Sequence, residues 1–493
     1  MTTKYIFKYA LVASLAIGFT SCKKSLDLQP ISDATVDNSY TSATQAEAAL
    51  AGAYNTFTSS DYYIWDNIFM GDVRSDNHYA GGDNTDFFQY DNLQVSATNS
   101  KVYTDWSNLY NGILKANTVI QKVPLINDAS LTDTRKSQIV GEAYFLRAFH
   151  YFQLVKGWGA VPLVLTPVST TNPEDVNTPR SSVADVYTQI IDDLTKAVAS
   201  LPDTYSDDAS VNKARATKGA ANALLAKVYA QKPDRDYAKV LEYANAVINS
   251  PAGYSLLPTY SNLFDGSHYN NSESILEVQF NGTTISNWAP SNILPPSLTN
   301  STWRKFITPS QDLAKAFDSE GDVVRKAQSM LFEKAPWVDE YWSASLNGTI
   351  PFSYKWRNLT NGSSTSRQYL LRLADIILLK SEALNALGST GEAATELNKI
   401  RSRAGLAAIT ATSQSDMALA IEKDRRLELC QEGQRWDDLV RYGRAETVMN
   451  SLVETNLVTG QPVNYNMTVQ KELLPIPQTE LNRNSSLTQN PGY

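Results

Sequence analysis

The 493-residue sequence contains few of the groups from which catalytic sites are usually built. Its three histidines, His78, His150 and His268, lie far apart and have no metal-ligand spacing. No motif of a zinc hydrolase, a serine hydrolase or a phosphate-binding loop is present. Adjacent acids such as Asp192 and Asp193 point apart on a helix. The sequence predicts no enzyme, no metal and no cofactor; a glycoside hydrolase, whose carboxylates need no local motif, stays an alternative.

Charged residues are also scarce. They make up 19% of the chain, the net charge is −8 at pH 7, and there is no basic run. This balance argues against nucleic acid as a partner and gives no electrostatic reason to lie on an anionic membrane. Hydrophobic residues, at 42%, are sufficient for a sizeable core.

The chain has only two cysteines, Cys22 and Cys430. Residues 1–21 begin with Lys4 and Lys8 and continue with an apolar run too short to span a bilayer, which is typical of an export signal. Cys22 follows small residues at the cleavage point and is the predicted lipidation site, with residues 22–40 as a tether. Cys430, left without a partner, is expected to be a small buried residue.

Helical patterns occupy most of the remaining chain, and alanines recur where paired helices would approach closely. We expect an N-terminal helical repeat region at 41–250 and a C-terminal helical region with an extended tail at 367–493. Such helix pairs are similar to tetratricopeptide repeats. The expected helices span residues 42–58, 105–123, 141–156, 181–200, 213–231, 236–249, 369–387, 391–404, 416–431 and 435–441.

Residues 251–366 differ from the rest of the chain and are predicted to be a loop-rich, ligand-binding insertion with short β-strands, for example at 274–280. Five of the nine tryptophans lie between positions 288 and 356, where even scatter would place about one. Aromatic residues in such polar, broken sequence suggest a binding surface more than a core. The candidate ligand contacts on this basis are Trp288, Trp303, Trp337, Tyr341 and Trp342.

A second candidate site lies in residues 61–98, which show no helical period and are too long for a passive connection. Near Trp65, the residues Asp72, Arg74, Asp76 and Asn77 bring together planar groups that could hydrogen-bond to sugar hydroxyls. The alternative is a turn network in which these side chains bond to one another. The charged cluster at 425–438 is interpreted as a structural ion-pair network.

Three stretches carry a family resemblance. They are GEAYFLRAFHYFQLVKGWGAVPL at 141–163, RRLEL running into EGQRWDDL at 425–439, and the tail from LPIP at 474–477 to the final NPGY. In the first, the phenylalanines at helical spacing predict a buried helix, in which Arg147 would need a partner. Together they resemble the signature of the SusD/RagB-like family of outer-membrane nutrient-binding lipoproteins.

The resemblance implies a mostly α-helical scaffold of tetratricopeptide-like repeats with an irregular insertion. It also implies a cell-surface lipoprotein that captures oligosaccharides and passes them to a SusC-like TonB-dependent outer-membrane transporter. Peptide capture, which some members of the family perform, is an alternative, as is a purely structural adaptor. Because the family has no invariant ligand motif, it assigns no binding residue here.

Replacing Cys22 tests the lipid anchor. The Cys22→Ala variant should leave the membrane fraction, because it would lack the acylated residue that holds the tether. Partitioning of wild type and variant between detergent and aqueous phases measures this. Equal membrane retention of the two proteins would show that Cys22 is not the anchor.

Overall fold

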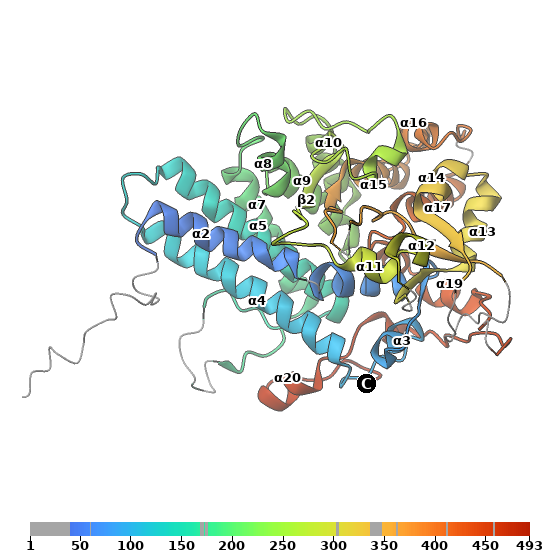
Figure 1. Ribbon diagram of the computed structural model, residues 1–493. Coiled ribbons are helices and arrows are strands. Elements are labelled where there is room, and N and C mark those ends of the chain that lie inside the picture. The colour runs from blue at the N-terminus through green and yellow to red at the C-terminus, as the bar shows by residue number, and fades with distance from the viewer. Residues whose placement is uncertain are drawn as a thin grey trace, which may run out of the picture.

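The computed structural model describes residues 40–59, 61–167, 172, 176–301, 305–335, 348–360, 363–410, 413–456 and 459–493, without the side chains of 63–67. Long helices stack side by side through most of this part of the chain, and short strands gather at one side (Figure 1). The main helices are α2 (Ala43–Tyr54), α4 (Ser100–Lys122), α5 (Asp133–Trp158), α7 (Val183–Ser200), α9 (Lys218–Gln231), α10 (Tyr237–Ile248), α15 (Leu373–Ala386), α16 (Thr390–Arg403), α17 (Gln414–Leu429) and α18 (Arg435–Arg441).

Shorter elements fill the connections and the insertion. The helical ones are η2 (Asn55–Thr58), the π-helix η3 (Asp61–Val73), α3 (Thr85–Asp91), η4 (Val123–Leu125), α8 (Ala209–Ala214), η5 (Tyr260–Leu263), α11 (Ala289–Ile293), α12 (Pro296–Thr299), α13 (Gln311–Glu320), α14 (Val323–Ser329), α19 (Ala445–Ser451), η7 (Val469–Glu472) and α20 (Gln478–Arg483). The strands are β1 (His78–Ala80), β2 (Ser274–Val278), β3 (Ile307–Pro309), β4 (Met330–Glu333), β5 (Ile350–Ser353) and β6 (Gln368–Arg372).

The helices pack as successive antiparallel hairpins, which confirms the predicted mostly helical repeat scaffold. Helices α4 and α5, α9 and α10, and α15 and α16 are such pairs, and α7 packs against both α5 and α9. Helix α10 also packs directly against α15. The stack itself is therefore continuous from α10 to α15. The long stretch of chain between these two helices leaves the stack after α10 and returns to it at α15.

The strands form three antiparallel two-stranded sheets, β1–β3, β2–β6 and β4–β5. The observed elements correct two expectations from the sequence. The start of the helix predicted at 369–387 is strand β6, whose residues pair with β2 before the helix begins. The stretch 61–98, predicted to lack helices, contains η3, α3 and β1.

Helix α5 lies at the centre of the stack. Phe145 and Phe149 are buried in the main core. Arg147 donates two hydrogen bonds to Asp193 of α7, at 2.8 and 2.7 Å, so the predicted charge partner is present. The helix ends at Gly159, where φ is +72° and glycine avoids the strain that a side chain would meet.

The extended tail covers the end of α5. The indole Nε1 of Trp158 donates to the carbonyl of Pro475 at 2.9 Å, and the backbone N–H of Leu474 donates to the carbonyl of Gly157 at 2.7 Å. Asn490 donates to the carbonyls of Trp158 and Leu474. The last turn of α5, whose carbonyls lack helical partners, is thus completed by the tail.

A buried ion-pair network joins α17 and α18 to distant parts of the chain, as the interpretation of residues 425–438 predicted. Arg425 pairs with Asp375 of α15 and with Asp438 of α18. Glu428 accepts hydrogen bonds from Arg372 of β6 at 2.7 Å and Arg403 of α16 at 2.5 Å. Because each of these charges is removed from water, each needs its partner to remain stable inside the protein.

The network also holds the loop that follows η3. Asp76 accepts two hydrogen bonds from Arg435, at 2.7 and 2.9 Å, and lies 3.3 Å from Arg426. Burial alone would raise the pKa of Asp76, but Arg426 and Arg435 hold that pKa at about 2. The end of η3 and the turn before α18 approach so closely that a Cβ at Gly71 would lie 2.0 Å from the carbonyl oxygen of Gly433.

Truncating Phe149 tests the burial of α5. Its ring lies 5.3 Å from Phe57 and 6.0 Å from Phe145, centroid to centroid, so Phe149→Ala should lower the free energy of unfolding by about 3–5 kcal/mol. Leu114→Ala is the control, because Leu114 is 47% exposed and its loss should change stability little. Denaturant titration of both variants measures the free energy of unfolding. A similarly small change in both variants would place Phe149 outside the core.

Neutralising Asp76 tests the network. Asp76→Asn should destabilise the protein by about 2–3 kcal/mol at pH 7, because Arg435 loses one of its two buried carboxylate partners and keeps only Glu422. Since the folded pKa of Asp76 lies below the unfolded value of 3.8, the wild-type advantage should be complete above pH 4 and disappear as the pH falls toward 2.

The matched control is Asp192→Asn. Asp192 forms an ion pair with Lys196, and both side chains are about half exposed, so its neutralisation should change stability little. Chemical denaturation across this pH range measures both variants. A pH-independent difference between wild type and Asp76→Asn would contradict the assignment.

Candidate functional site

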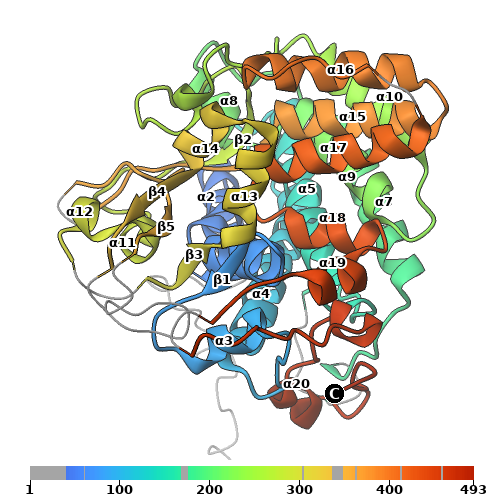
Figure 2. The ribbon, with the colours of Figure 1, turned by 90° about the vertical axis from the view of Figure 1, so that its right-hand side faces the viewer.

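The insertion forms one side of the molecule. Viewed in Figure 2, α11, α12, β4 and β5 lie together at the edge away from the stacked helices α15, α16 and α17, and β1 and β3 lie next to them. Strand β3 pairs with β1 and also contacts β5. This surface, made by α11, α12 and the strands β1, β3, β4 and β5, is called the insertion face below.

Four of the predicted ligand contacts belong to two short segments next to this face in the sequence. Trp303 falls in 302–304, and Trp337, Tyr341 and Trp342 fall in 336–347, all outside the described residues. The described ends of these segments lie close together. Glu333 pairs with Ile350 across the β4–β5 sheet, and Ser297 of α12 donates to Glu333 through its backbone N–H, at 3.3 Å, and through its hydroxyl.

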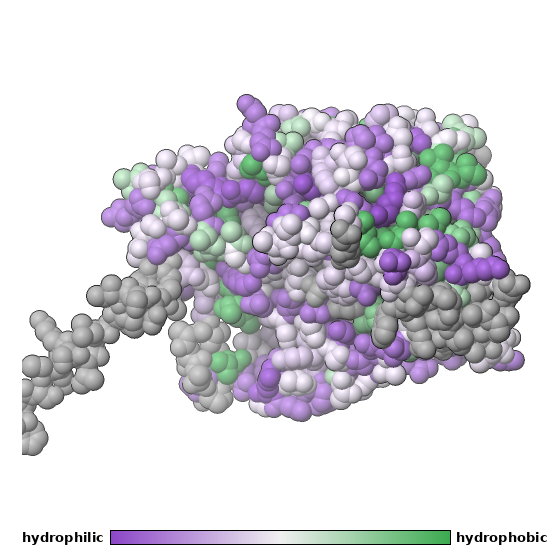
Figure 3. All heavy atoms as spheres, viewed as in Figure 1, coloured by the Kyte–Doolittle hydropathy of each residue, from purple (hydrophilic) through white to green (hydrophobic). Residues whose placement is uncertain are grey.

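The described part of the insertion face carries exposed apolar side chains. Leu298 of α12 is 40% exposed and Phe332 of β4 is 39% exposed. Figure 3 shows hydrophobic residues gathered over the region of α11 and α12. Beneath them, Lys305 donates to the carbonyl of Ser291 and to Thr299 Oγ1, and its burial lowers its pKa to about 8. These bonds join the two short helices to the start of β3.

Trp288 stands at the start of α11. It is half-buried and packs against the main core. The preceding residue, Asn287, is fully buried and fixes the backbone by donating to the carbonyl of Ser366 at 2.8 Å. Trp356 corrects the expectation that the insertion is too polar for a core, because it is 5% exposed and belongs to the main core.

The second candidate site, in the loop that contains Asp72 to Asn77, is buried and bonded to other parts of the protein. Asp72, Arg74, Asp76 and Asn77 are all at most 2% exposed. Asp72 accepts from the N–H of Gly433 at 2.7 Å, and burial raises its pKa to about 7. These contacts favour the self-bonding alternative, with bonds that extend to the C-terminal helices. The backbone of Trp65 lies in η3, and its side chain is outside the described part.

The side chains of the other two loop residues also meet protein groups. Arg74 donates to the carbonyl of Lys471 at 2.6 Å and lies over the ring of Trp436, 4.3 Å from its centroid. Asn77 accepts from Arg426 at 2.8 Å. A ligand on the surface would not reach these buried groups.

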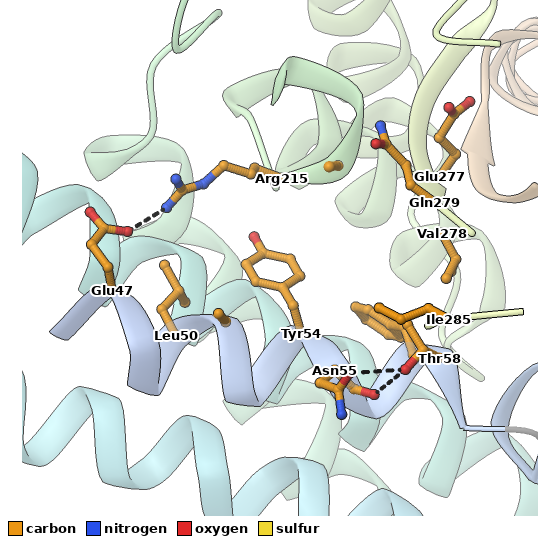
Figure 4. A pocket seen from close by; sticks show the side chains of 13 residues that line it. Glu47, Leu50, Tyr54, Asn55, Thr58, Arg215, Glu277, Val278, Gln279 and Ile285 are labelled. Atoms are coloured by element: carbon orange, nitrogen blue, oxygen red, sulfur yellow. Dashed lines mark hydrogen bonds and ion pairs between the residues drawn. The ribbon is translucent and has the colours of Figure 1, made fainter. Parts of the chain in front are cut away.

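A hollow that the sequence did not predict lies between α2, α8 and the end of β2. It has a volume of about 410 Å³ and is lined by Leu50, Ala51, Tyr54, Arg215 and Gln279, among others (Figure 4). No local sequence pattern marks it, because α2 lies more than 150 positions before the other segments that form its walls. Only the packing of the insertion against the first helix creates it.

The described residues hold neither a metal site nor a membrane span. Among them, no group of three or more His, Cys, Asp or Glu side chains is arranged to bind a metal ion. Likewise, no helix in the described part of the chain is long and apolar enough to cross a membrane.

Comparison with known proteins covers almost the whole chain. Residues 24–230 match a family model described as "Starch-binding associating with outer membrane", and residues 337–493 match the model of the SusD family. SusD-like protein P38 of Formosa agariphila is 29% identical over 91% of this chain and 94% of its own length. The starch-binding protein SusD of Bacteroides thetaiotaomicron is 25% identical, with both chains fully covered.

Solved structures agree with these relatives. A laminarin-binding SusD-like protein superposes with a TM-score of 0.77 at 28% identity, over 92% of this chain and all of that one. A SusD homolog from Bacteroides thetaiotaomicron gives a TM-score of 0.78 at 23% identity, over 93% and 98% of the two chains, which shows the shared fold. With both family models matched in order along one helical stack, the chain belongs to the SusD/RagB family.

Proposed function

We propose that this protein is a cell-surface lipoprotein that captures oligosaccharides and delivers them to a TonB-dependent transporter in the outer membrane. Family membership supports this, since one matched model is described as starch-binding and associating with the outer membrane. Relatives of this chain are named for binding starch and laminarin. The proposed role is binding without catalysis.

The observation that carries the proposal is that described residues next to both tryptophan-bearing segments meet on the insertion face. Ser297 of α12, a few residues before 302–304, donates to Glu333 of β4, a few residues before 336–347, on the insertion face. Exposed Leu298 and Phe332 lie on the same face. Aromatic and apolar groups there would cover the C–H face of a sugar ring, as aromatic side chains with a polar edge do at interfaces.

The scaffold supports delivery because it holds the insertion face rigidly. The insertion is joined to the helix stack where β2 pairs with β6, and Arg325 of α14, shortly before β4, pairs with Asp424 of α17. A lipid on Cys22 would keep the protein at the membrane that contains the transporter, with residues 22–40 as the tether. Binding of the transporter over the loaded insertion face would then enclose the glycan.

Replacing the tryptophans one at a time tests the glycan site. At least one of Trp288→Ala, Trp303→Ala, Trp337→Ala and Trp342→Ala should weaken oligosaccharide binding by about five- to thirtyfold, which corresponds to a stacking contact worth on the order of 1–2 kcal/mol. Calorimetric titration with starch and laminarin oligosaccharides, and with peptides, measures the affinity. Thermal melts of the same variants measure folding.

Trp356→Ala is the matched control. Trp356 lies in the core, so its truncation should lower the melting temperature without a selective loss of binding. If these four variants all bind as wild type does, the insertion face is not the glycan site. If only peptides bind to wild type, the protein is a peptide-capturing member of the family.

A further inference from the structure

We propose that the hollow between α2, α8 and β2 is a second binding site, which takes one neutral sugar unit. The choice of a sugar as the ligand rests on the proposed function, whereas the site itself is separate from the insertion face. Its volume of about 410 Å³ lies within the range of small-molecule sites in proteins. The described residues that line it lie outside α11, α12 and the strands of the insertion face.

The floor of the hollow is apolar. Leu50 and Ala51 of α2 form one wall, and Val278 and Ile285 lie opposite them, with the ring of Tyr54 between the two walls (Figure 4). The Tyr54 hydroxyl is already satisfied, because it donates to Glu142 at 2.9 Å and accepts from the N–H of Ala216 at 2.8 Å. The ring is therefore held in place and presents an apolar surface to a ligand.

The charges beside the hollow balance, which argues for a neutral ligand. Arg215 pairs with Glu142 at 2.8 Å and with Glu47 at 3.3 Å. Arg135 pairs with the same two carboxylates. Two guanidinium groups thus face these two carboxylates, and Glu277, a third carboxylate that lines the hollow, pairs with Arg367. A charged ligand would therefore find no unpaired opposite charge. Burial raises the pKa of Glu142 to about 7, so the balance is complete at pH 8.

Hydrogen-bonding groups remain available on both sides of the hollow. Both N–H groups of the Gln279 amide are used, by the carbonyl of Ser210 and by Asn270 Oδ1, which fixes the amide in one orientation. Within the described part of the chain, Gln279 Oε1 and Arg215 Nη1 have no hydrogen-bond partner. One acceptor and one donor across an apolar floor suit a ring that carries hydroxyl groups.

The position of the hollow relates it to the captured glycan. Ile285, in its wall, belongs to the same connection that leads into Trp288 and α11. The hollow therefore borders the segment of chain that runs from β2 to the insertion face. A site here would hold a sugar unit of the same glycan or a short fragment of it.

Filling the hollow tests the proposal. Ala51 is exposed on α2 and lines the hollow, so Ala51→Trp should occupy it without disturbing the core. Ala48→Trp is the matched control, because Ala48 is exposed on the same helix and lies outside the lining. Saturation-transfer NMR at pH 8 with glucose, galactose, mannose and xylose at millimolar concentration reports binding, and thermal melts confirm folding.

We expect wild type and Ala48→Trp to give a signal with at least one of these sugars, and Ala51→Trp to lose it. The measurement is repeated in a tryptophan variant that no longer binds oligosaccharide, so that the insertion face contributes no signal. Absence of a signal with all four sugars in wild type, or an equal signal in folded Ala51→Trp, would overturn the proposal.

The result is independent of the test of the insertion face. If the tryptophan variants keep full oligosaccharide affinity while Ala51→Trp loses the monosaccharide signal, the proposed glycan platform fails and the second site stands. If the tryptophan variants lose affinity while Ala51→Trp behaves as wild type, the platform stands and the hollow is not a sugar site.

Discussion

The buried charges of α17 and α18 constrain the arrangement of the whole molecule. Arg425, Glu428 and Arg435 are all at most 5% exposed, and each must find an opposite charge inside the protein. Those partners come from the loop after η3, from β6 and from helices α15 to α18. Removing one partner would leave a buried charge unpaired, so these segments can form their native contacts only together.

This constraint separates the parts of the protein that must stay fixed from those that can vary. The helix stack passes directly from α10 to α15, and the insertion is joined to it where β2 pairs with β6 and where Arg325 and Lys355 pair with Asp424 and Glu432. The short helices α11 and α12 contain no charged residue, so changes there leave these ion pairs intact. A rigid scaffold that carries variable connections allows one fold to serve different ligands.

The helical scaffold was predictable because its signals are local. Helix α18 spans the predicted residues 435–441, and the phenylalanine spacing of α5 correctly indicated burial on several sides. The ion pairs of residues 425–438 were also predictable in kind, since so many charges next to Trp436 and Leu439 need partners. The distant residues with which they pair were not predictable, because Asp76, for example, lies more than 340 positions away from Arg435.

Where the prediction failed, a tertiary contact outweighed local composition. The residues of β6 have helix-forming leucines, but the pairing with β2 makes them a strand. Trp356 lies in polar sequence and yet is buried, because the helix stack supplies its neighbours. Asp72 and Asn77 have the composition of a ligand loop, and only the approach of Gly433 shows that this loop faces inward.

The contact between Trp158 and Pro475 joins residues 317 positions apart. During synthesis and export, α5 therefore emerges long before the segment that completes its last turn. Until residues 474–490 arrive, the end of the central helix and the indole of Trp158 are open to water and to proteases. Contacts of such high sequence separation form slowly, and a chain that stopped before residue 474 would lack the groups that complete α5.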